Sequence, residues 1–202
     1  MPKTAGRYQA SIQAQLADSS RTIAALKDQT PLIEDMGRCL IEAYQRGNKI
    51  LTFGNGGSSC DAQNFADELV GRYCRNRPPL PAMALTLSQA DLTSIANDFG
   101  YEWVFARQLE AHGRKGDIAV AISTSGNSPN VLRAIETARK FGLFTLGFSG
   151  ETGGKMRDMV DLCLCVPSKS TGRIQEAHIT VIQILCGMVE ETLFADVPKV
   201  HD

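Results

Sequence analysis

Two short stretches of the chain combine the residue types that bind phosphate groups. They are "GNGGSS" at residues 54–59 and "STSGNS" at residues 123–128, and each joins an apolar run to a predicted helix. Glycines let the backbone approach a ligand closely, and the free N–H groups at a helix start attract an anion. The second stretch adds four hydroxyl groups, which can bind a phosphate monoester without a cation. Each stretch alone also fits an ordinary helix N-cap, but the two together favour a phosphorylated ligand.

Neither stretch matches a nucleotide-binding motif. The first lacks the lysine of the Walker motif, and its glycine spacing differs from GxGxxG. The sequence "TGGKMRD" at residues 152–158 has a lysine but none of the rest of that motif, so it predicts only another helix start.

Glu68 is the candidate for proton-transfer chemistry, because it lies in the helix predicted after the first stretch and carboxylates act as general bases. Its local sequence, "ADEL", also fits an amphipathic helix whose acidic side chains face water, and this pattern alone favours a solvated Glu68. Arg72, four residues later, could pair with Glu68 across one helical turn or contact a ligand.

The elements that must position these residues alternate along the chain. Apolar runs occur at residues 49–53, 82–87, 117–123, 144–149 and 161–166, and helical stretches separate them. Further helices are predicted at 8–28, 31–46 and about 172–194. This alternation is typical of an α/β fold with a parallel sheet and helices on both faces. Because ligands bind beyond the carboxyl ends of such strands, both phosphate stretches are expected at one edge of the sheet.

Composition narrows the class of protein. The 202 residues fit one domain, and a formal net charge of -1 provides no general attraction to nucleic acid or to an anionic membrane. No run of about 18 apolar residues occurs, and the first residues lack the apolar core of a signal peptide. The sequence therefore predicts a cytoplasmic protein that binds neither membrane nor nucleic acid.

The six cysteines are scattered, mostly among apolar neighbours, and they have no zinc-finger spacing. They are predicted to be buried free thiols, as in a reducing compartment. Two of them, Cys163 and Cys165, should face the same side of one strand because strand side chains alternate.

Several motifs together resemble the sugar isomerase (SIS) family, and more closely its phosphoheptose isomerase branch. They are "GNGGSS", "ELVGRY", "RPPLPAMAL", "IANDFGY", "GRKGDIAVAISTSGNSPNVLRAI" and "RIQEAH", in order between about residues 8 and 195. The resemblance implies a single SIS domain over 1–202, with a core at about 30–195 and an N-terminal helix at about 8–28. It also implies a five-stranded parallel sheet flanked by helices, and a homotetramer in which the terminal helices pack and active sites are shared between subunits.

The resemblance also implies an activity and a set of site residues. Enzymes of this branch interconvert the ketose sedoheptulose 7-phosphate and the aldose D-glycero-D-manno-heptose 7-phosphate through an enediol, a step towards the heptose of bacterial lipopolysaccharide. Glu68 would be the base, and Gln175 a polar contact to the reacting end. The substrate contacts carried over by the motifs are Asn55, Gly56, Gly57, Glu68, Asn97, Asp98, Ser123, Thr124, Ser125, Ser128 and Gln175.

This sequence departs from the branch at its metal site. The zinc ligands of the branch correspond here to Asn64, Glu68, Gln175 and Gln183, and the branch typically has histidine at the positions of Asn64 and Gln183. Amide side chains do not titrate and are poor zinc ligands. We therefore expect neither zinc nor any other cofactor.

The histidines that the chain does have are not substitutes. His112 lies in a predicted polar loop, and His201 lies in the C-terminal tail. His178 is on the last predicted helix, but at about 100° per residue it projects about 140° away from Gln183. We expect His178 to be a structural, hydrogen-bonded residue.

Two classes of function stay open at this point. One is an isomerase of phosphorylated heptose, with weakened or altered activity because two histidines are replaced. The other is a non-catalytic sugar-phosphate-binding or regulatory protein that acts through protein contacts, like the DnaA initiator-associating protein, which is also similar. The retained Glu68 favours the enzyme.

Overall fold

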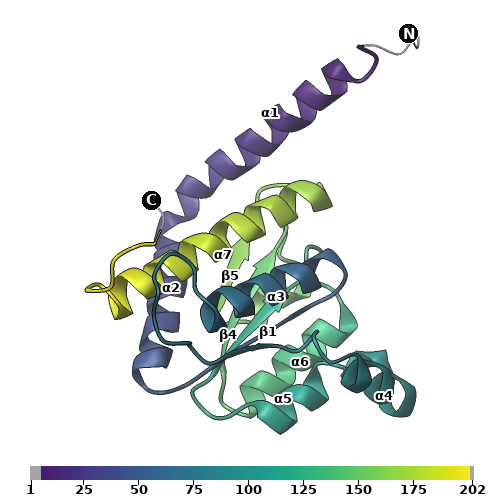
Figure 1. Cartoon of the computed structure of the whole chain (residues 1–202). Coiled ribbons are helices and arrows are strands. Elements are labelled where there is room, and N and C mark those ends of the chain that lie inside the picture. The colour runs from purple at the N-terminus through teal and green to yellow at the C-terminus, as the bar shows by residue number, and fades with distance from the viewer. Residues whose placement is uncertain (1–5, 201–202) are drawn as a thin grey trace.

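A five-stranded parallel sheet forms the centre of the computed structural model, which describes residues 6–200; His201 lies outside the described residues. The strands are β1 (Ile50–Gly54), β2 (Ala82–Ala84), β3 (Ile118–Ile122), β4 (Phe144–Ser149) and β5 (Leu162–Cys165). Their order is β2-β1-β3-β4-β5, and every neighbouring pair is parallel. The predicted five-stranded parallel sheet flanked by helices is therefore confirmed (Figure 1).

Helices α2 (Thr30–Gln45), α3 (Gly57–Val70) and α7 (Thr171–Leu193) cover one face of the sheet. Helices α5 (Ala106–His112) and α6 (Pro129–Lys140) cover the other face. Side chains alternate along each strand, so Ile50 joins the first apolar core and Leu51 the second. Strands buried on both faces explain why the sequence showed continuous apolar runs instead of alternating ones.

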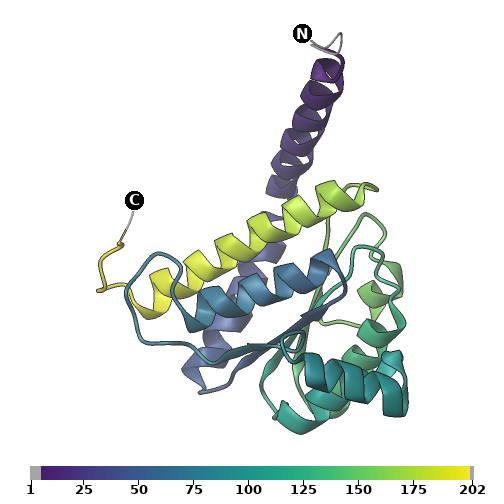
Figure 2. The same cartoon turned by 45° about the vertical axis from the view of Figure 1, so that its right-hand side comes forward.

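Helices α3 and α7 lie side by side in both views (Figures 1 and 2). Both enter from the carboxyl edge of the sheet, because α3 follows β1 directly and α7 follows the loop after β5. Their contacts repeat at a nearly constant sequence offset: Gly57 meets Gln175 and Asn64 meets Gln183. The two helices therefore run parallel, and the seam between them carries the predicted site residues of α3 and α7.

The remaining elements are shorter or less buried. The segment after β2 forms α4 (Gln89–Phe99), which has no buried residue, and the 3-10 turn η2 (Tyr101–Trp103) follows it. The segment after β4 holds another 3-10 turn, η3 (Gly154–Asp158). The helix start predicted at residues 152–158 is therefore this single 3-10 turn.

Two predicted boundaries were wrong. The first helix does not extend over residues 8–28: α1 ends at Ala25 and a 3-10 turn, η1 (Leu26–Gln29), connects it to α2. The second strand does not extend over 82–87, because only Ala82–Ala84 pair with β1 before the chain turns towards α4.

Helix α1 (Gln9–Ala25) extends away from the sheet (Figures 1 and 2), and its middle reaches α7, where Arg173 donates to the carbonyl oxygen of Gln15 at 2.6 Å. Apolar side chains spaced four residues apart, Tyr8, Ile12 and Leu16, are 61%, 53% and 66% exposed. This spacing gives a continuous apolar stripe on one side of the helix.

Within residues 6–200 there is no helix with the length and apolarity needed to span a bilayer.

The cysteines only partly match their prediction. All six are free, but only Cys186 is buried, and Cys60 is exposed. The sulfur atoms of Cys163 and Cys165 are 3.8 Å apart, so these two side chains do face the same way.

Candidate functional site

The two phosphate-binding stretches lie next to each other at the carboxyl edge of the sheet. The glycine loop, which we define as residues 54–57, follows β1, and the hydroxyl loop, residues 123–128, follows β3. Strands β1 and β3 are paired up to their last residues, where Gly54 faces Ile122. The placement expected from the sequence is confirmed, and a single ligand can contact both loops.

The hydroxyl loop presents donors to one side. Ser123 Oγ and Ser128 Oγ are 3.2 Å apart, which points both hydroxyl groups to the same place. Among the hydrogen bonds of residues 6–200, the N–H groups of Thr124, Ser125 and Ser128 donate to no protein group. Free N–H groups and hydroxyls gathered at the start of α6 suit an anion.

A tight contact holds the hydroxyl loop in shape. Gly126 has a φ of 63°, and a Cβ added there would lie 1.9 Å from the carbonyl oxygen of Gly153. Only glycine fits that position, so the loop packs directly against the segment after β4. A further hydrogen bond of 3.0 Å runs from Gly150 N to Thr124 O.

A cavity of about 340 Å³ opens beside the hydroxyl loop. It lies between the loops after β3, β4 and β5, and its lining is Thr124, Ser125, Gly150, Glu151, Thr152, Ser168, Lys169, Thr171 and Ile174. Lys169 brings a cation to this cavity from a segment remote in sequence, which local sequence patterns around the hydroxyl loop do not reveal. Its ammonium group lies 3.8 Å from the Glu151 carboxylate and is largely exposed.

Gln175 lies over the start of α3. A Cβ added at Gly57 would be 2.1 Å from Gln175 Nε2, so the glycine is required for this approach. The N-terminal end of α3 thus combines an exposed glycine loop with an amide from α7, which places Gln175 at the same edge of the sheet as both loops.

Glu68, Asn64 and Gln183 form a second group further along the α3–α7 seam. Gln183 Nε2 donates to Asn64 Oδ1 at 2.8 Å and to Glu68 Oε1 at 3.3 Å. All three side chains are half-buried. Among residues 6–200, the Glu68 carboxylate accepts a side-chain hydrogen bond from the Gln183 amide and makes no ion pair with Arg72.

Four residues match the zinc ligands of the resembling branch, and within one chain Gln175 lies away from the other three. Gln175 and Gln183 are eight residues apart on α7, which is about 12 Å along the helix axis. Gln175 contacts Gly57, whereas Gln183 contacts Asn64 and Glu68. Within a single subunit they form two groups instead of one site.

The residues present do not fit a zinc site. Gln183 turns a donor group toward the oxygens of Asn64 and Glu68, so these atoms are used in hydrogen bonds. Among residues 6–200, no three His, Cys, Asp or Glu side chains lie close enough together to hold a metal ion. One carboxylate and two amides are a weak ligand set for zinc, which prefers imidazole and thiolate.

His178 is buried in the core, away from this group. Its Nε2 lies 3.2 Å from the carbonyl oxygen of Ser149, and its ring packs edge-on against Phe148. Burial lowers the pKa of His178 to about 4, so the ring is neutral at physiological pH. The predicted structural role of His178 is confirmed by these contacts.

Asn97 and Asp98 belong to α4 and to neither loop. Both are exposed at the end of α4, where Asn97 Nδ2 donates to Asp98 Oδ1 at 2.8 Å. Asp98 lines a different cavity, of about 290 Å³, together with Arg107 and His112. His112 is the last residue of α5, so its predicted place in a loop was wrong.

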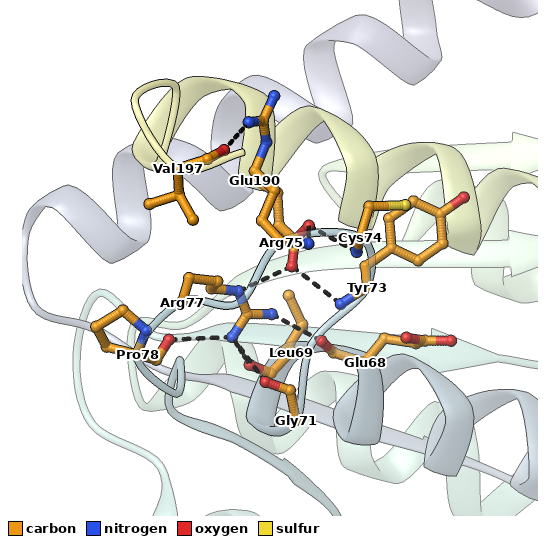
Figure 3. A network of polar contacts seen from close by, with 10 residues as sticks. All are labelled: Glu68, Leu69, Gly71, Tyr73, Cys74, Arg75, Arg77, Pro78, Glu190 and Val197. Carbon is orange, nitrogen blue, oxygen red and sulfur yellow. Dashed lines mark hydrogen bonds and ion pairs between the residues drawn. The ribbon is translucent and has the colours of Figure 1, made fainter. Parts of the chain in front are cut away.

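The C-terminal end of α3 is held by a buried ion pair that local sequence patterns do not reveal (Figure 3). Arg77 Nε lies 3.0 Å from Glu190 Oε1, and both side chains are almost fully buried. Arg77 also donates to the main-chain carbonyl oxygens of Glu68 at 2.7 Å and Leu69 at 2.6 Å. The guanidinium group thereby caps the last turn of α3, directly at the candidate base.

Glu190 completes this arrangement from α7. Its carboxylate accepts hydrogen bonds from three consecutive main-chain N–H groups, those of Tyr73, Cys74 and Arg75, at 2.8–2.9 Å. Arg75 in turn donates to the carbonyl oxygen of Val197 (Figure 3). We refer to Arg77, Glu190 and the residue 73–75 N–H groups as the α3–α7 clasp.

Asp61 is a buried carboxyl group on α3, between Gly57 and Asn64 in sequence. Its Oδ2 has no hydrogen-bond partner among the described residues. Burial raises the pKa of Asp61 to about 6 from its ordinary value of 3.8.

Comparison with known proteins gives one consistent family. The SIS domain matches residues 14–150 of this chain. A curated protein from Roseiflexus, named phosphoheptose isomerase, is 51% identical over 185 residues, which cover 92% of each chain. One of the same name from Aneurinibacillus thermoaerophilus is 52% identical over 163 residues, 81% of this chain and 82% of its own. A solved phosphoheptose isomerase structure from Neisseria gonorrhoeae is 37% identical with a TM-score of 0.87, and the match covers 91% of this chain and 99% of that one.

Proposed function

This chain belongs to the SIS domain family, and we propose that it is a phosphoheptose isomerase, which interconverts sedoheptulose 7-phosphate and D-glycero-D-manno-heptose 7-phosphate. The observation that carries this function is about half sequence identity, over more than four fifths of the chain, to curated enzymes of that name. Since those relatives are named as isomerases, they favour catalysis over a purely regulatory role.

The hydroxyl loop is the proposed phosphate site. Its serine and threonine hydroxyls and free N–H groups would hold the phosphate, and the ammonium group of Lys169 lies at the rim of the same cavity. Binding energy gained there, far from the reacting carbons, holds the sugar in register for the proton transfer. The neighbouring glycine loop, the amide of Gln175 and the exposed Asn97–Asp98 pair are the proposed contacts to the sugar.

Glu68 is the proposed general base. It removes a proton from C1 of the ketose while the C2 carbonyl oxygen gains a proton, which gives the enediol. Return of the proton to C2, with loss of the proton from the C1 hydroxyl, produces the aldose. The amide of Gln175 would donate a hydrogen bond to the oxygen on which negative charge develops, while Gln183 holds the Glu68 carboxylate in place.

We propose that this isomerase works without zinc. The support is the chemistry of its ligand positions, where two amides replace two imidazoles, and the hydrogen bonds that already use the Asn64 and Glu68 oxygens. Amides polarise a carbonyl oxygen less strongly than a metal ion does, so a lower turnover rate than in zinc-containing relatives is expected.

We further propose a homotetramer with active sites shared between subunits, in the cytoplasm. The support for sharing is the separation of the Gln175 and Gln183 groups in one chain, because a second subunit can bring one group to the other. The support for assembly is the exposed apolar stripe of α1.

A coupled assay of the purified protein with sedoheptulose 7-phosphate, with and without added zinc, tests this function. Isomerisation that requires no added zinc and survives chelation is the expected result. A protein that binds the sugar phosphate without turnover would overturn the proposed activity, and a strict zinc requirement would overturn the proposed metal independence.

Binding of the phosphate can be tested separately. Replacing Ser123 and Ser125 by alanine should weaken binding of sedoheptulose 7-phosphate by about 1–3 kcal/mol, because charge-assisted hydrogen bonds are lost. If calorimetry finds the same affinity in the folded double variant, the hydroxyl loop is not the phosphate site.

A further inference from the structure

Two asparagines connect the glycine loop to the hydroxyl loop by a reciprocal pair of hydrogen bonds. Asn55 Nδ2 donates to Asn130 Oδ1 at 2.8 Å, and Asn130 Nδ2 donates back to Asn55 Oδ1 at 2.8 Å. Asn55 follows β1, whereas Asn130 is the second residue of α6, just after the hydroxyl loop. The pair therefore bridges the two segments that we propose to hold opposite ends of the same substrate.

Tyr101 extends this bridge to a third segment. Its hydroxyl group donates to Asn55 Oδ1 at 3.0 Å, so that oxygen accepts from two donors. Tyr101 begins η2, directly after α4, and it is 60% exposed. Asn130, by contrast, is only 2% exposed, and its Oδ1 also accepts from Val131 N at 3.0 Å.

These contacts leave the Asn55 side chain little freedom to serve the substrate. Its carbonyl oxygen is saturated, and one of its two amide hydrogens is given to Asn130. Because both its oxygen and its nitrogen are hydrogen-bonded to protein, the Asn55 amide holds the two loops at a set distance and has little freedom to bind a ligand. The main-chain atoms of the glycine loop remain available for the sugar.

We propose that Asn130 and Tyr101 are positioning residues that fix the distance between the two loops and thereby the length of sugar phosphate that reacts. The proposal rests on the proposed function, in which the hydroxyl loop binds the phosphate and the carbon to be deprotonated lies beyond the glycine loop. If the spacing relaxes, the phosphate still binds, but the reacting end loses its register, and small displacements of reacting atoms cost rate steeply.

Two conservative substitutions, each changing only one polar group, test the bridge between the loops. Tyr101→Phe removes only a hydroxyl group from an exposed side chain, so it is not expected to disturb folding. Asn130→Asp keeps the shape of the side chain but replaces the Nδ2 donor by an oxygen that faces Asn55 Oδ1. Tyr44→Phe, on α2, is the matched control for loss of a tyrosine hydroxyl, because the Tyr44 hydroxyl lies 3.5 Å from Pro81 O and contacts neither loop.

The measurement is calorimetric affinity for sedoheptulose 7-phosphate and for inorganic phosphate, together with kcat/KM for sedoheptulose 7-phosphate and for fructose 6-phosphate, a ketose one carbon shorter. We expect affinity for inorganic phosphate to stay unchanged in Tyr101→Phe, whereas the carboxylate of Asn130→Asp at the start of α6 repels phosphate and should weaken binding of both ligands. Affinity and kcat/KM for sedoheptulose 7-phosphate should fall about three- to tenfold in Tyr101→Phe and further in Asn130→Asp. The preference for the seven-carbon over the six-carbon ketose should shrink in parallel.

Two results would overturn the proposal. Equal losses of affinity for inorganic phosphate and for sedoheptulose 7-phosphate in Tyr101→Phe would show general damage to the phosphate site. No loss of affinity or kcat/KM for sedoheptulose 7-phosphate in Tyr101→Phe would show that the bridge does not set the spacing. If the parent protein fails to isomerise sedoheptulose 7-phosphate, the proposed function falls, but the ratio of the two binding affinities still decides whether the bridge positions a ligand.

Discussion

At the scale of single residues, the amide of Gln183 is the most informative side chain of the site. It donates to both Asn64 and Glu68, and it occupies a position where the resembling enzymes have a metal-binding histidine. A hydrogen-bond donor can orient a carboxylate and polarise an oxygen, but it does not titrate and holds no metal. We therefore propose that Glu68 determines the chemistry of this site, with amides as its support.

The first prediction is a gain of metal binding on restoring both imidazoles. Asn64→His with Gln183→His would give two imidazoles and the Glu68 carboxylate, and three good ligands are what a catalytic zinc site needs. The double variant should copurify with zinc and isomerise sedoheptulose 7-phosphate faster than the parent, as elemental analysis and the coupled assay would measure. Each single variant should gain much less, and a parent that already holds stoichiometric zinc would contradict the reading of both positions.

The second prediction concerns Asp61. Its pKa is about 6 in the folded protein and 3.8 ordinarily, so between these pH values the folded protein keeps a proton that the unfolded chain has released. The free energy of unfolding therefore falls as pH rises from about 4 to about 6, by up to about 3 kcal/mol for this group.

Asp61→Asn removes this dependence. The stability of the variant relative to the parent should be lowest at pH 4 and should increase by pH 7, as urea unfolding at both pH values would measure. Asp67→Asn, on the exposed side of the same helix, is the control. A relative stability of Asp61→Asn that is the same at both pH values would show that Asp61 titrates normally.

At the scale of elements, α3 and α7 carry Glu68, Gln175 and Gln183, and the α3–α7 clasp joins the two helices. Arg77 caps the last carbonyl groups of α3, and Glu190 fixes the chain that follows it. Breaking one side of a buried ion pair leaves the other charge without compensation, which typically costs about 3–5 kcal/mol.

The third prediction follows from the clasp. Arg77→Met should lower the free energy of unfolding by about 3–5 kcal/mol, because the Glu190 carboxylate stays buried without its partner. The matched control is Arg46→Met, which breaks an exposed pair with Glu42 and should change stability by less than about 1 kcal/mol. Similar effects of the two variants in urea unfolding would contradict the role given to the clasp.

Elements determined by neighbouring residues can be predicted from the sequence, whereas features determined by contacts between distant residues cannot. The five strands, the helices after the two loops and the placement of those loops at one edge follow from local apolar runs and glycines. The end of β2 at Ala84 and the break in the first helix at Ala25 do not, because tertiary contacts decide them. Lys169, Asn130 and Arg77 were missed for the same reason, since each acts on residues distant in sequence or through a buried side chain.

At the scale of the whole molecule, the described chain has exposed apolar surface and a divided set of site residues. The stripe Tyr8, Ile12 and Leu16 is more than half exposed within the described part of the chain, and the Gln175 and Gln183 groups are separate. Both features are explained if α1 packs on a second subunit and if subunits complete each other's sites.

The fourth prediction is that this protein is a tetramer in solution and that its subunits complement each other. Glu68→Gln should remove the proposed base from the group that Glu68 forms with Asn64 and Gln183. The Ser123→Ala, Ser125→Ala double variant should weaken phosphate binding at the hydroxyl loop. If the sites are shared, unfolding and refolding the two inactive proteins together should restore part of the parent activity. A monomer in sedimentation at micromolar concentration, or no activity in mixed tetramers, would contradict shared sites.

The clasp has a consequence for the order of synthesis. The main-chain N–H groups of Tyr73, Cys74 and Arg75 precede their acceptor, Glu190, by 115–117 residues. While the chain is leaving the ribosome, the glycine loop, α3 and the entire sheet are complete before α7 exists. The end of α3, and with it the candidate base, acquires its final support only when Glu190 has been made. A chain interrupted before that residue lacks the charge that balances Arg77.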